Sequence, residues 1–231
     1  MITLGEAHRL GACQEALDWG AERRDWSWEE AWETLKRDHP DWAAWAMVHV
    51  PTCPIDLEGM SPEDRAEVMA SRKDCPVDLT GMNPEDRAWV MVERKDCPID
   101  LEGMSSDERA WVMVRRKDCP IDLEGLDSWD RAQVMVRRKD CPVDLTGLDS
   151  VGRAQVMAVR KDCPIDLEGM SSWNRMSVMI ARQDCPVDLE GLTIPERERV
   201  IAHRGEGKVY DGEGNIGGDS PEGRVEHNRS V

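Results

Sequence analysis

The sequence has no Phe and only one Tyr among its 231 residues, so Leu, Val, Ile, Met and ten Trp must fill any hydrophobic core. It also has no run of 18 apolar residues, which excludes a transmembrane helix. No basic segment precedes an apolar one at the start of the chain. We therefore expect no signal peptide and a cytoplasmic location.

Positive charge is scarce as well. Lys and Arg number 30 against 47 Asp and Glu, which gives a net charge of −17 and a pI near 4.7. Such a chain repels phosphate groups, so we expect no direct binding to nucleic acid and none to a membrane. The expected partner is a protein with a basic surface.

The sequence lacks the motifs of common catalytic and metal sites. It has no GxGxxG, P-loop, HExxH, GxSxG or CxxC segment, and its five His are scattered. A cysteine nucleophile needs a nearby His, which the repeating cysteines lack, so we expect no enzyme activity, no metal and no cofactor. One segment near the end has EF-hand offsets, but Ile216 stands where the calcium loop needs Gly, and a hairpin or disorder is favoured. Its residues are Asp211, Glu213, Asn215, Asp219 and Glu222.

Seven of the eight cysteines recur at one constant interval, and each is followed by Pro. A fixed period, here of about 22 residues, is typical of a repeat array in which every copy packs on the next. Neighbouring helices pack about 8–10 Å apart, whereas a disulfide needs Cα atoms within about 7 Å, so we expect reduced, buried thiols. The seven positions are Cys53, Cys75, Cys97, Cys119, Cys141, Cys163 and Cys185.

Each copy is expected to contain two helices. The Pro after each Cys suits the first turn of a helix, so Pro142–Leu145 should form a single turn, which Gly147 ends in a left-handed conformation. A longer helix should follow a Ser, Asn, Asp or Thr cap, for example Ser128–Arg138. The apolar stripe that faces the neighbouring copies should contain Ala132, Met135 and Val136, with Val134 beside it.

An Arg opens each apolar stripe, and an Asp stands two residues after each repeated Pro. A row of anion-binding Arg residues is one interpretation. The simpler one is a ladder of Arg–Asp ion pairs and helix caps that sets the register between copies. With the buried cysteines, the expected structural ladder consists of Cys75, Cys97, Cys119, Cys141, Cys163, Arg87, Arg109, Arg131 and Arg153.

The repeated pattern R-A-x-V-M-x-x-R-x-D-C-P-x-D-L-x-G-L resembles the leucine-rich-repeat-variant family over seven copies, residues 53–204. That resemblance implies an all-α fold in which α-helices and 3₁₀ helices alternate in a right-handed solenoid. These copies are shorter than the family's units, and Cys13 alone precedes them, so the family's iron–sulfur cluster is not expected. An ordinary leucine-rich repeat is the alternative fold, because the period lies within its range, but its L-x-x-L-x-L ladder is absent.

Residues 1–52 differ from the copies and hold six of the ten Trp. We expect them to form a helical cap whose large rings seal the first copy. Its helices should run over Leu4–Glu22 behind a Thr3 cap, from a capping box at Ser27 to about Arg37, and onward from Pro40.

Residues 11–45 are similar to a small helical module of uncharacterised phage and bacterial proteins, a resemblance that implies an origin in a mobile element. Residues 205–231 are rich in Gly and charge, and they should form a turn-rich tail.

Variation between the copies indicates where a partner binds. The helix position after Arg-Ala holds Glu, Trp, Gln, Ser and Arg in different copies, so it should not be core. Trp89 and Trp111 occupy it in neighbouring copies and should form an exposed apolar patch, unless each ring lies flat over its own helix. The copies that start at Cys53, Cys75 and Cys97 have net charges of −3, −2 and −1. We therefore expect a non-enzymatic scaffold that binds a protein through Trp89, Trp111, Glu63, Glu67, Glu85 and Glu93.

The alternative hypothesis is a phage-encoded inhibitor that mimics DNA and blocks a nucleic-acid-binding defence protein, of the anti-CRISPR or anti-restriction type. The net charge of −17 supports it. The basic residues at each helix end, such as those at 137–139, oppose it because they interrupt a continuous negative stripe. Such an inhibitor acts in the cytoplasm of the bacterial host.

Overall fold

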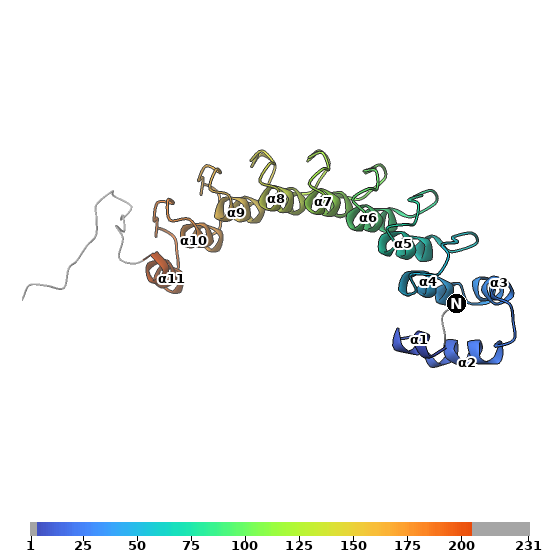
Figure 1. Cartoon of the computed structure of the whole chain (residues 1–231). Coiled ribbons are helices and arrows are strands. Elements are labelled where there is room, and N and C mark those ends of the chain that lie inside the picture. The colour runs from blue at the N-terminus through green and yellow to red at the C-terminus, as the bar shows by residue number, and fades with distance from the viewer. Residues whose placement is uncertain (1–3, 205–231) are drawn as a thin grey trace, which may run out of the picture. The chain divides into compact units, whose positions relative to one another are not determined.

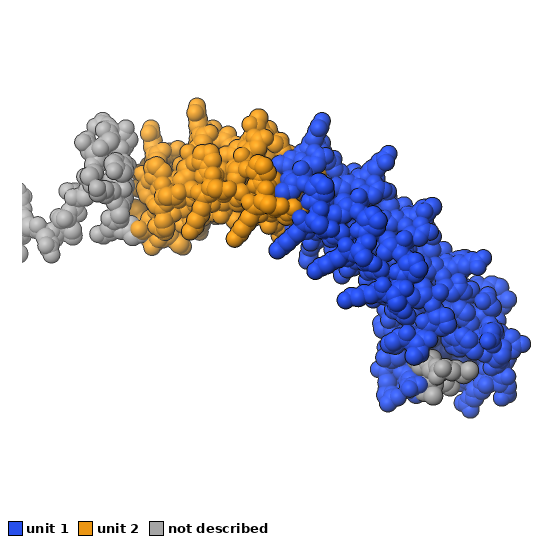
Figure 2. Space-filling model, turned by 45° about the horizontal axis from the view of Figure 1, so that its top comes forward, with its two compact units in different colours: residues 1–125 blue, residues 126–231 orange. Residues whose placement is uncertain are grey.

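The computed structural model describes residues 4–204, so the expected Thr3 cap, the calcium-like segment and the tail lie outside the described residues. The described residues form eleven α-helices, and their element order contains no strand. The protein divides into two compact units, residues 1–125 and residues 126–231 (Figure 2).

In unit 1, α1 packs against α2, and from α3 onward each helix packs against the next one along the chain (Figure 1). Its helices are α1 (Leu4–Arg9), α2 (Gln14–Glu22), α3 (Trp28–Asp38), α4 (Pro40–His49), α5 (Pro62–Ser71), α6 (Pro84–Glu93) and α7 (Ser106–Arg115). The helices α5 to α7 begin one sequence repeat apart, as expected. Pro40 lies one further repeat length before Pro62, so α4 stands in register with the repeating helices although its sequence was assigned to the cap.

In unit 2, each helix likewise packs against its successor. Its described helices are α8 (Ser128–Arg137), α9 (Ser150–Val159), α10 (Ser172–Ala181) and α11 (Ile194–Arg204). The repeating helices of both units recur with the period of the cysteines, and within each unit they pack in chain order. The predicted all-α repeat solenoid is therefore confirmed.

The cap differs from the prediction in one respect. The single helix expected over Leu4–Glu22 is wrong, because the chain breaks between α1 and α2 at Gly11, whose φ is 92°. Glycine adopts this left-handed conformation without a steric penalty and so ends helices readily. The capping box at Ser27 is confirmed: its hydroxyl accepts from the Glu30 backbone N–H, and the Glu30 carboxylate accepts from the Ser27 N–H.

The repeating helices bury a different stripe from the one predicted. In α9, Ala154, Val156 and Met157 are buried, and the same three helix positions are buried in α5 to α8. Val134 is therefore fully buried, whereas Val136 is half-buried, the reverse of the expected order. The reason is that α9 packs against both α8 and α10, so its buried face must be wide enough to contact two neighbours.

The one-turn helix expected at Pro142–Leu145 does not form; these residues have no regular secondary structure, and a turn follows them. The Asp144 carboxylate accepts from the Thr146 backbone N–H at 2.9 Å, and the Asp144 N–H donates to Met135 Sδ at 3.5 Å. Such side-chain bonds compete with the helical backbone pattern. Gly147 then closes the turn with a φ of 74°.

The Arg that opens each helix stripe lies against the Asp of the following repeat. The distances are 3.2 Å for Arg87–Asp100, 3.1 Å for Arg109–Asp122, 3.5 Å for Arg131–Asp144 and 3.6 Å for Arg153–Asp166. The Asp partners are half exposed or more, so each pair contributes little by itself. Together the pairs set the register of the array, because each one joins a copy to its successor at the same residue offset.

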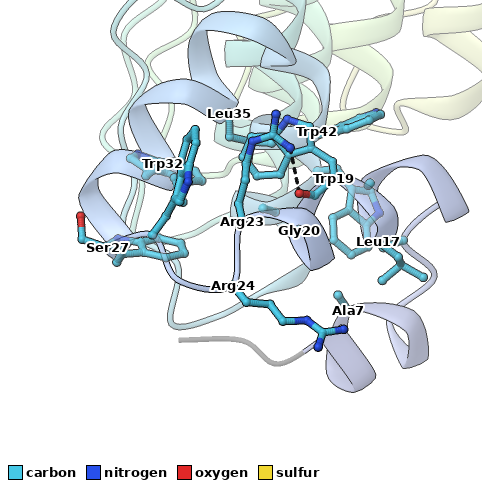
Figure 3. A pocket seen from close by; sticks show the side chains of 17 residues that line it. Ala7, Leu17, Trp19, Gly20, Arg23, Arg24, Ser27, Trp32, Leu35 and Trp42 are labelled. Carbon is cyan, nitrogen blue, oxygen red and sulfur yellow. Dashed lines mark hydrogen bonds between the residues drawn. The ribbon is translucent and has the colours of Figure 1, made fainter.

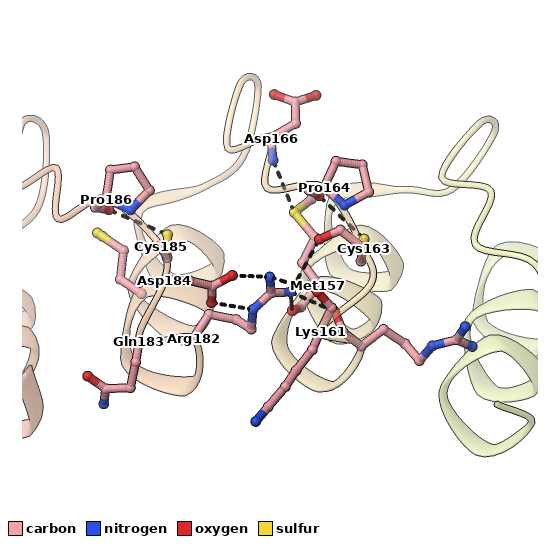
Figure 4. Close-up of polar contacts among 12 residues, drawn as sticks. Met157, Lys161, Cys163, Pro164, Asp166, Arg182, Gln183, Asp184, Cys185 and Pro186 are labelled. Carbon is pink, nitrogen blue, oxygen red and sulfur yellow. Dashed lines mark hydrogen bonds and ion pairs between the residues drawn. The ribbon is translucent and has the colours of Figure 1, made fainter.

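A second Arg stands at the C-cap of each repeating helix. This is the Arg of the repeat that is buried in the core. Arg182 is 4% exposed, and its Nη1 donates to the carbonyls of Met157 at 2.9 Å and of Arg160 at 2.6 Å. Its guanidinium group also forms an ion pair with the Asp184 carboxylate (Figure 4). The last carbonyls of a helix have no partner within the helix and carry partial negative charge. The Arg of one repeat therefore caps the helix of the repeat before it. Arg94 does the same for α5, and Arg72 for α4.

The seven repeating cysteines are buried and free, and their thiols lie beside the following Pro. In Cys163, Sγ donates to the Pro164 carbonyl at 3.4 Å. Burial raises the pKa of six of these thiols, those of Cys53, Cys75, Cys97, Cys141, Cys163 and Cys185, and for Cys53 to about 11. They therefore stay protonated at neutral pH and pack as small apolar groups.

Candidate functional site

The repeating helices of unit 1 present a face with two parallel rows of residues. The first row takes the second residue of each helix and is acidic in all four: Asp41, Glu63, Glu85 and Asp107. The second row lies one turn further along and consists of Trp45, Glu67, Trp89 and Trp111. Side chains four residues apart share one face of a helix, so the rows are adjacent. We call these eight residues, together with Glu93 one turn beyond Trp89, the acidic face.

The residues of the first row are exposed, and those of the second row are partly covered. Glu63, Glu85, Glu93 and Asp107 are exposed. Trp111 is 37% exposed, but Trp89 is half-buried, so the two rings do not form the fully open patch that was expected. The rings supply an apolar strip beside a row of carboxylates.

Glu67 is half-buried and has a different setting from the other glutamates. It lines a pocket of about 300 Å³ together with Asp41, Trp45 and residues around Cys13. The start of α2 therefore lies close to the first part of the acidic face. Among the predicted site residues, the exposed carboxylates are therefore those of Glu63, Glu85 and Glu93.

The charge of the chain is concentrated in this unit. Residues 1–125 contain 28 acidic and 15 basic residues, whereas residues 126–204 contain 13 and 12. Several basic residues of unit 1 also point inward, since Arg94 and Arg116 are 4% and 3% exposed and bind backbone carbonyls. The outer surface of unit 1 is consequently more acidic than the sequence suggests.

Family models, curated proteins and solved structures give no match to this chain. The resemblance to leucine-rich-repeat variants and to phage modules thus stays a prediction. Within residues 4–204, no cluster of His, Cys, Asp and Glu has the arrangement of a metal site. None of the helices in that range is long and apolar enough to span a membrane.

In unit 2 the helix position that is acidic in unit 1 is apolar. Trp129, Val151 and Trp173 occupy it in three consecutive helices and are 56%, 52% and 54% exposed. Val151, which stands between the two Trp positions in the repeat order, was not predicted as an exposed apolar residue from the sequence. Alignment of the copies at this one position would have revealed it. Arg199 lies 5.7 Å from the Trp173 ring centroid and borders the row.

A pocket that was not predicted from the sequence lies in the cap, between α1 and α2 on one side and α3 and α4 on the other (Figure 3). Its volume is about 400 Å³, and all six Trp of the cap line it. The rings were expected to seal the first copy, but in the structure they surround a cavity. They come from separate helices and one turn, so no local sequence pattern brings them together.

Proposed function

We propose that this chain is a non-enzymatic repeat protein that binds a Lys- and Arg-rich segment of a partner protein through the acidic face. The observation that supports it is the unbroken row of Asp41, Glu63, Glu85 and Asp107 in four consecutive helices, flanked by Trp rings. Carboxylates at a regular spacing attract a basic segment and speed its association. The Trp rings offer apolar contact to the long side-chain stems of Lys and Arg, and their faces attract the cationic groups.

The spacing of the row favours a repetitive ligand. Neighbouring helices pack about 8–10 Å apart, and a helical peptide presents every seventh residue at about 10.5 Å. A helix with a basic residue in each heptad would therefore meet one carboxylate per repeat. Trp111 and the edge of Trp89 would lie beside its apolar residues.

The test is selection of ligands from a random peptide library displayed on ribosomes, with the full chain as bait. We expect enrichment of Lys and Arg, and binding that weakens as the salt concentration rises and surface charges are screened. Glu63→Gln with Glu85→Gln and Glu93→Gln should weaken the recovered peptides at least tenfold.

A matched control removes the same charge from the loops. Glu58, Glu102 and Glu124 are exposed in the turns between helices, and changing all three to Gln should alter affinity less than twofold. Trp89→Ala with Trp111→Ala should weaken binding without altering its salt dependence. Recovered peptides that are no more basic than the library, or equal effects of the two charge variants, would contradict the proposal.

A second candidate, a phage-encoded mimic of DNA that blocks a nucleic-acid-binding defence protein, is favoured by the inward-pointing Arg94 and Arg116. Basic residues at the helix ends were expected to interrupt a negative stripe, but these two donate to backbone carbonyls of the preceding repeat. Mimicry predicts that proteins captured from a bacterial lysate bind DNA, and that added double-stranded DNA releases them. Capture that DNA leaves unchanged argues for the peptide-binding function instead.

A further inference from the structure

The cap pocket has the size and walls of a ligand site. Its volume of about 400 Å³ falls within the range typical of small-molecule pockets. Trp19, Trp28, Trp42 and Trp45 line it and are half-buried, so part of each indole surface is not covered by the protein. Stacked or edge-on contact with such faces favours a flat aromatic group over a branched aliphatic one.

The charge of the pocket is opposite to that of its surroundings. Arg23 and Arg24 both line it, and none of the described residues that line it is acidic, although unit 1 carries a large excess of acid. The ion pair of Arg23 is with Glu22 at 3.4 Å, and the Glu22 side chain is 75% exposed. Arg24 is exposed and makes no ion pair among residues 4–204. The pocket is therefore a cationic site on an acidic unit.

Aromatic rings hold Arg23 in place. Its Cζ lies 4.3 Å from the Trp19 ring centroid and 5.2 Å from that of Trp26, and its Nη1 donates to the Trp19 carbonyl at 3.0 Å. Its Nε has no acceptor within the described residues. The guanidinium is thus positioned before any ligand arrives, which lowers the entropic cost of binding an anion.

We propose that this pocket binds a small organic anion with a flat aromatic body, whose ring lies among the indoles. Arg23 and Arg24, which point to different parts of the pocket (Figure 3), supply the positive charge that attracts its carboxylate or sulfonate. The site shares Trp45 with the acidic face but includes none of the carboxylates of that face, and it does not depend on the function proposed for them. An all-Trp cage without Arg would instead favour a cation. The two Arg residues reverse that preference.

The test is isothermal titration calorimetry of the full chain with three naphthalene probes that differ chiefly in charge. 2-Naphthoate should bind at least tenfold more tightly than neutral 2-naphthamide, and 2-naphthylmethylammonium should bind most weakly. Arg24→Gln should weaken naphthoate about fivefold and change naphthamide less than twofold. Arg37→Gln removes the same charge from an exposed position that does not line the pocket, and it should leave all three affinities unchanged.

The location is tested separately by ¹⁹F NMR of the chain labelled with 5-fluorotryptophan. Naphthoate should shift the signals of Trp19 and Trp42 and leave those of Trp111 and Trp173 in place. The proposal is overturned by equal affinities for naphthoate and naphthamide, by the absence of binding at millimolar naphthoate, or by shifts outside the cap. Arg24 is exposed, so its substitution preserves the fold, which circular dichroism can verify.

Discussion

The C-cap arginines should be among the most costly side chains to remove, and Arg182 shows why. It is 4% exposed, and its Nη1 donates to the carbonyls of Met157, Arg160 and Cys163. Arg182→Ala leaves these carbonyls without a donor and leaves Asp184 without its partner. Hydrogen bonds to a charged group contribute about 1.5–3 kcal/mol each but do not add fully. The Asp184 carboxylate is exposed, so the loss of its partner adds little. From the three carbonyls we therefore expect the free energy of unfolding to fall by about 3–5 kcal/mol.

The assay is urea unfolding followed by far-ultraviolet circular dichroism. Gln183→Ala changes the exposed neighbour of Arg182 and should alter stability by less than about 0.5 kcal/mol. Arg182→Lys should recover less than half of the loss, because an ammonium cannot reproduce the planar fork. A loss for Arg182→Ala within about 1 kcal/mol of Gln183→Ala would refute the view that this residue caps the preceding helix.

Three further predictions concern the thiols, acid stability and the apolar row. In an Ellman assay of the native, reduced protein, Cys13 should react quickly and alone, because the repeating cysteines are buried; rapid reaction of several thiols would contradict the packing. The hydrogen bond from Arg182 lowers the pKa of Asp184 to about 2, and equivalent pairs recur along the chain. A carboxyl with a lowered folded pKa stabilises the protein above its unfolded pKa of about 3.9, so the urea midpoint should stay level from pH 7 to pH 5 and fall from pH 4 to pH 2; a level midpoint throughout would oppose this. Trp129→Glu with Trp173→Glu should shift Tm by less than about 4 °C, since both rings are more than half exposed; a much larger shift in a thermal melt would show that the rings are structural.

Much of the fold could be predicted from the sequence because short-range chemistry repeats in it. The caps at Ser61 and Asn83 each accept from a backbone N–H three residues on, and the glycine that ends each turn has a positive φ. These features depend on neighbours within a few positions. The one-turn helix failed for a local reason too, because the side chain of Asp144 bonds to the backbone in place of a helical carbonyl.

The candidate sites were less accessible from sequence. The row of carboxylates was recognised in part through Glu63 and Glu85, whereas Asp41 and Asp107 were missed. Asp41 lies on a helix without the repeat's two arginines, so the repeat pattern does not include it. The burial of Trp89 and the covering of Glu67 by the cap depend on packing between helices that no period describes.

Arg153 and Arg160 show which features of the structure follow from the local sequence and which depend on packing between helices. Both positions hold Arg in copy after copy, and the repeat pattern alone dictates the period, the helices and their caps. Packing alone decides that Arg153 meets a half-solvated Asp, whereas Arg160 is buried against the carbonyls of Met135 and Cys141 in the preceding repeat. The physical reason is that a cap or a turn is completed by adjacent residues, while burial, cavities and continuous surface rows exist only once separate helices have come together.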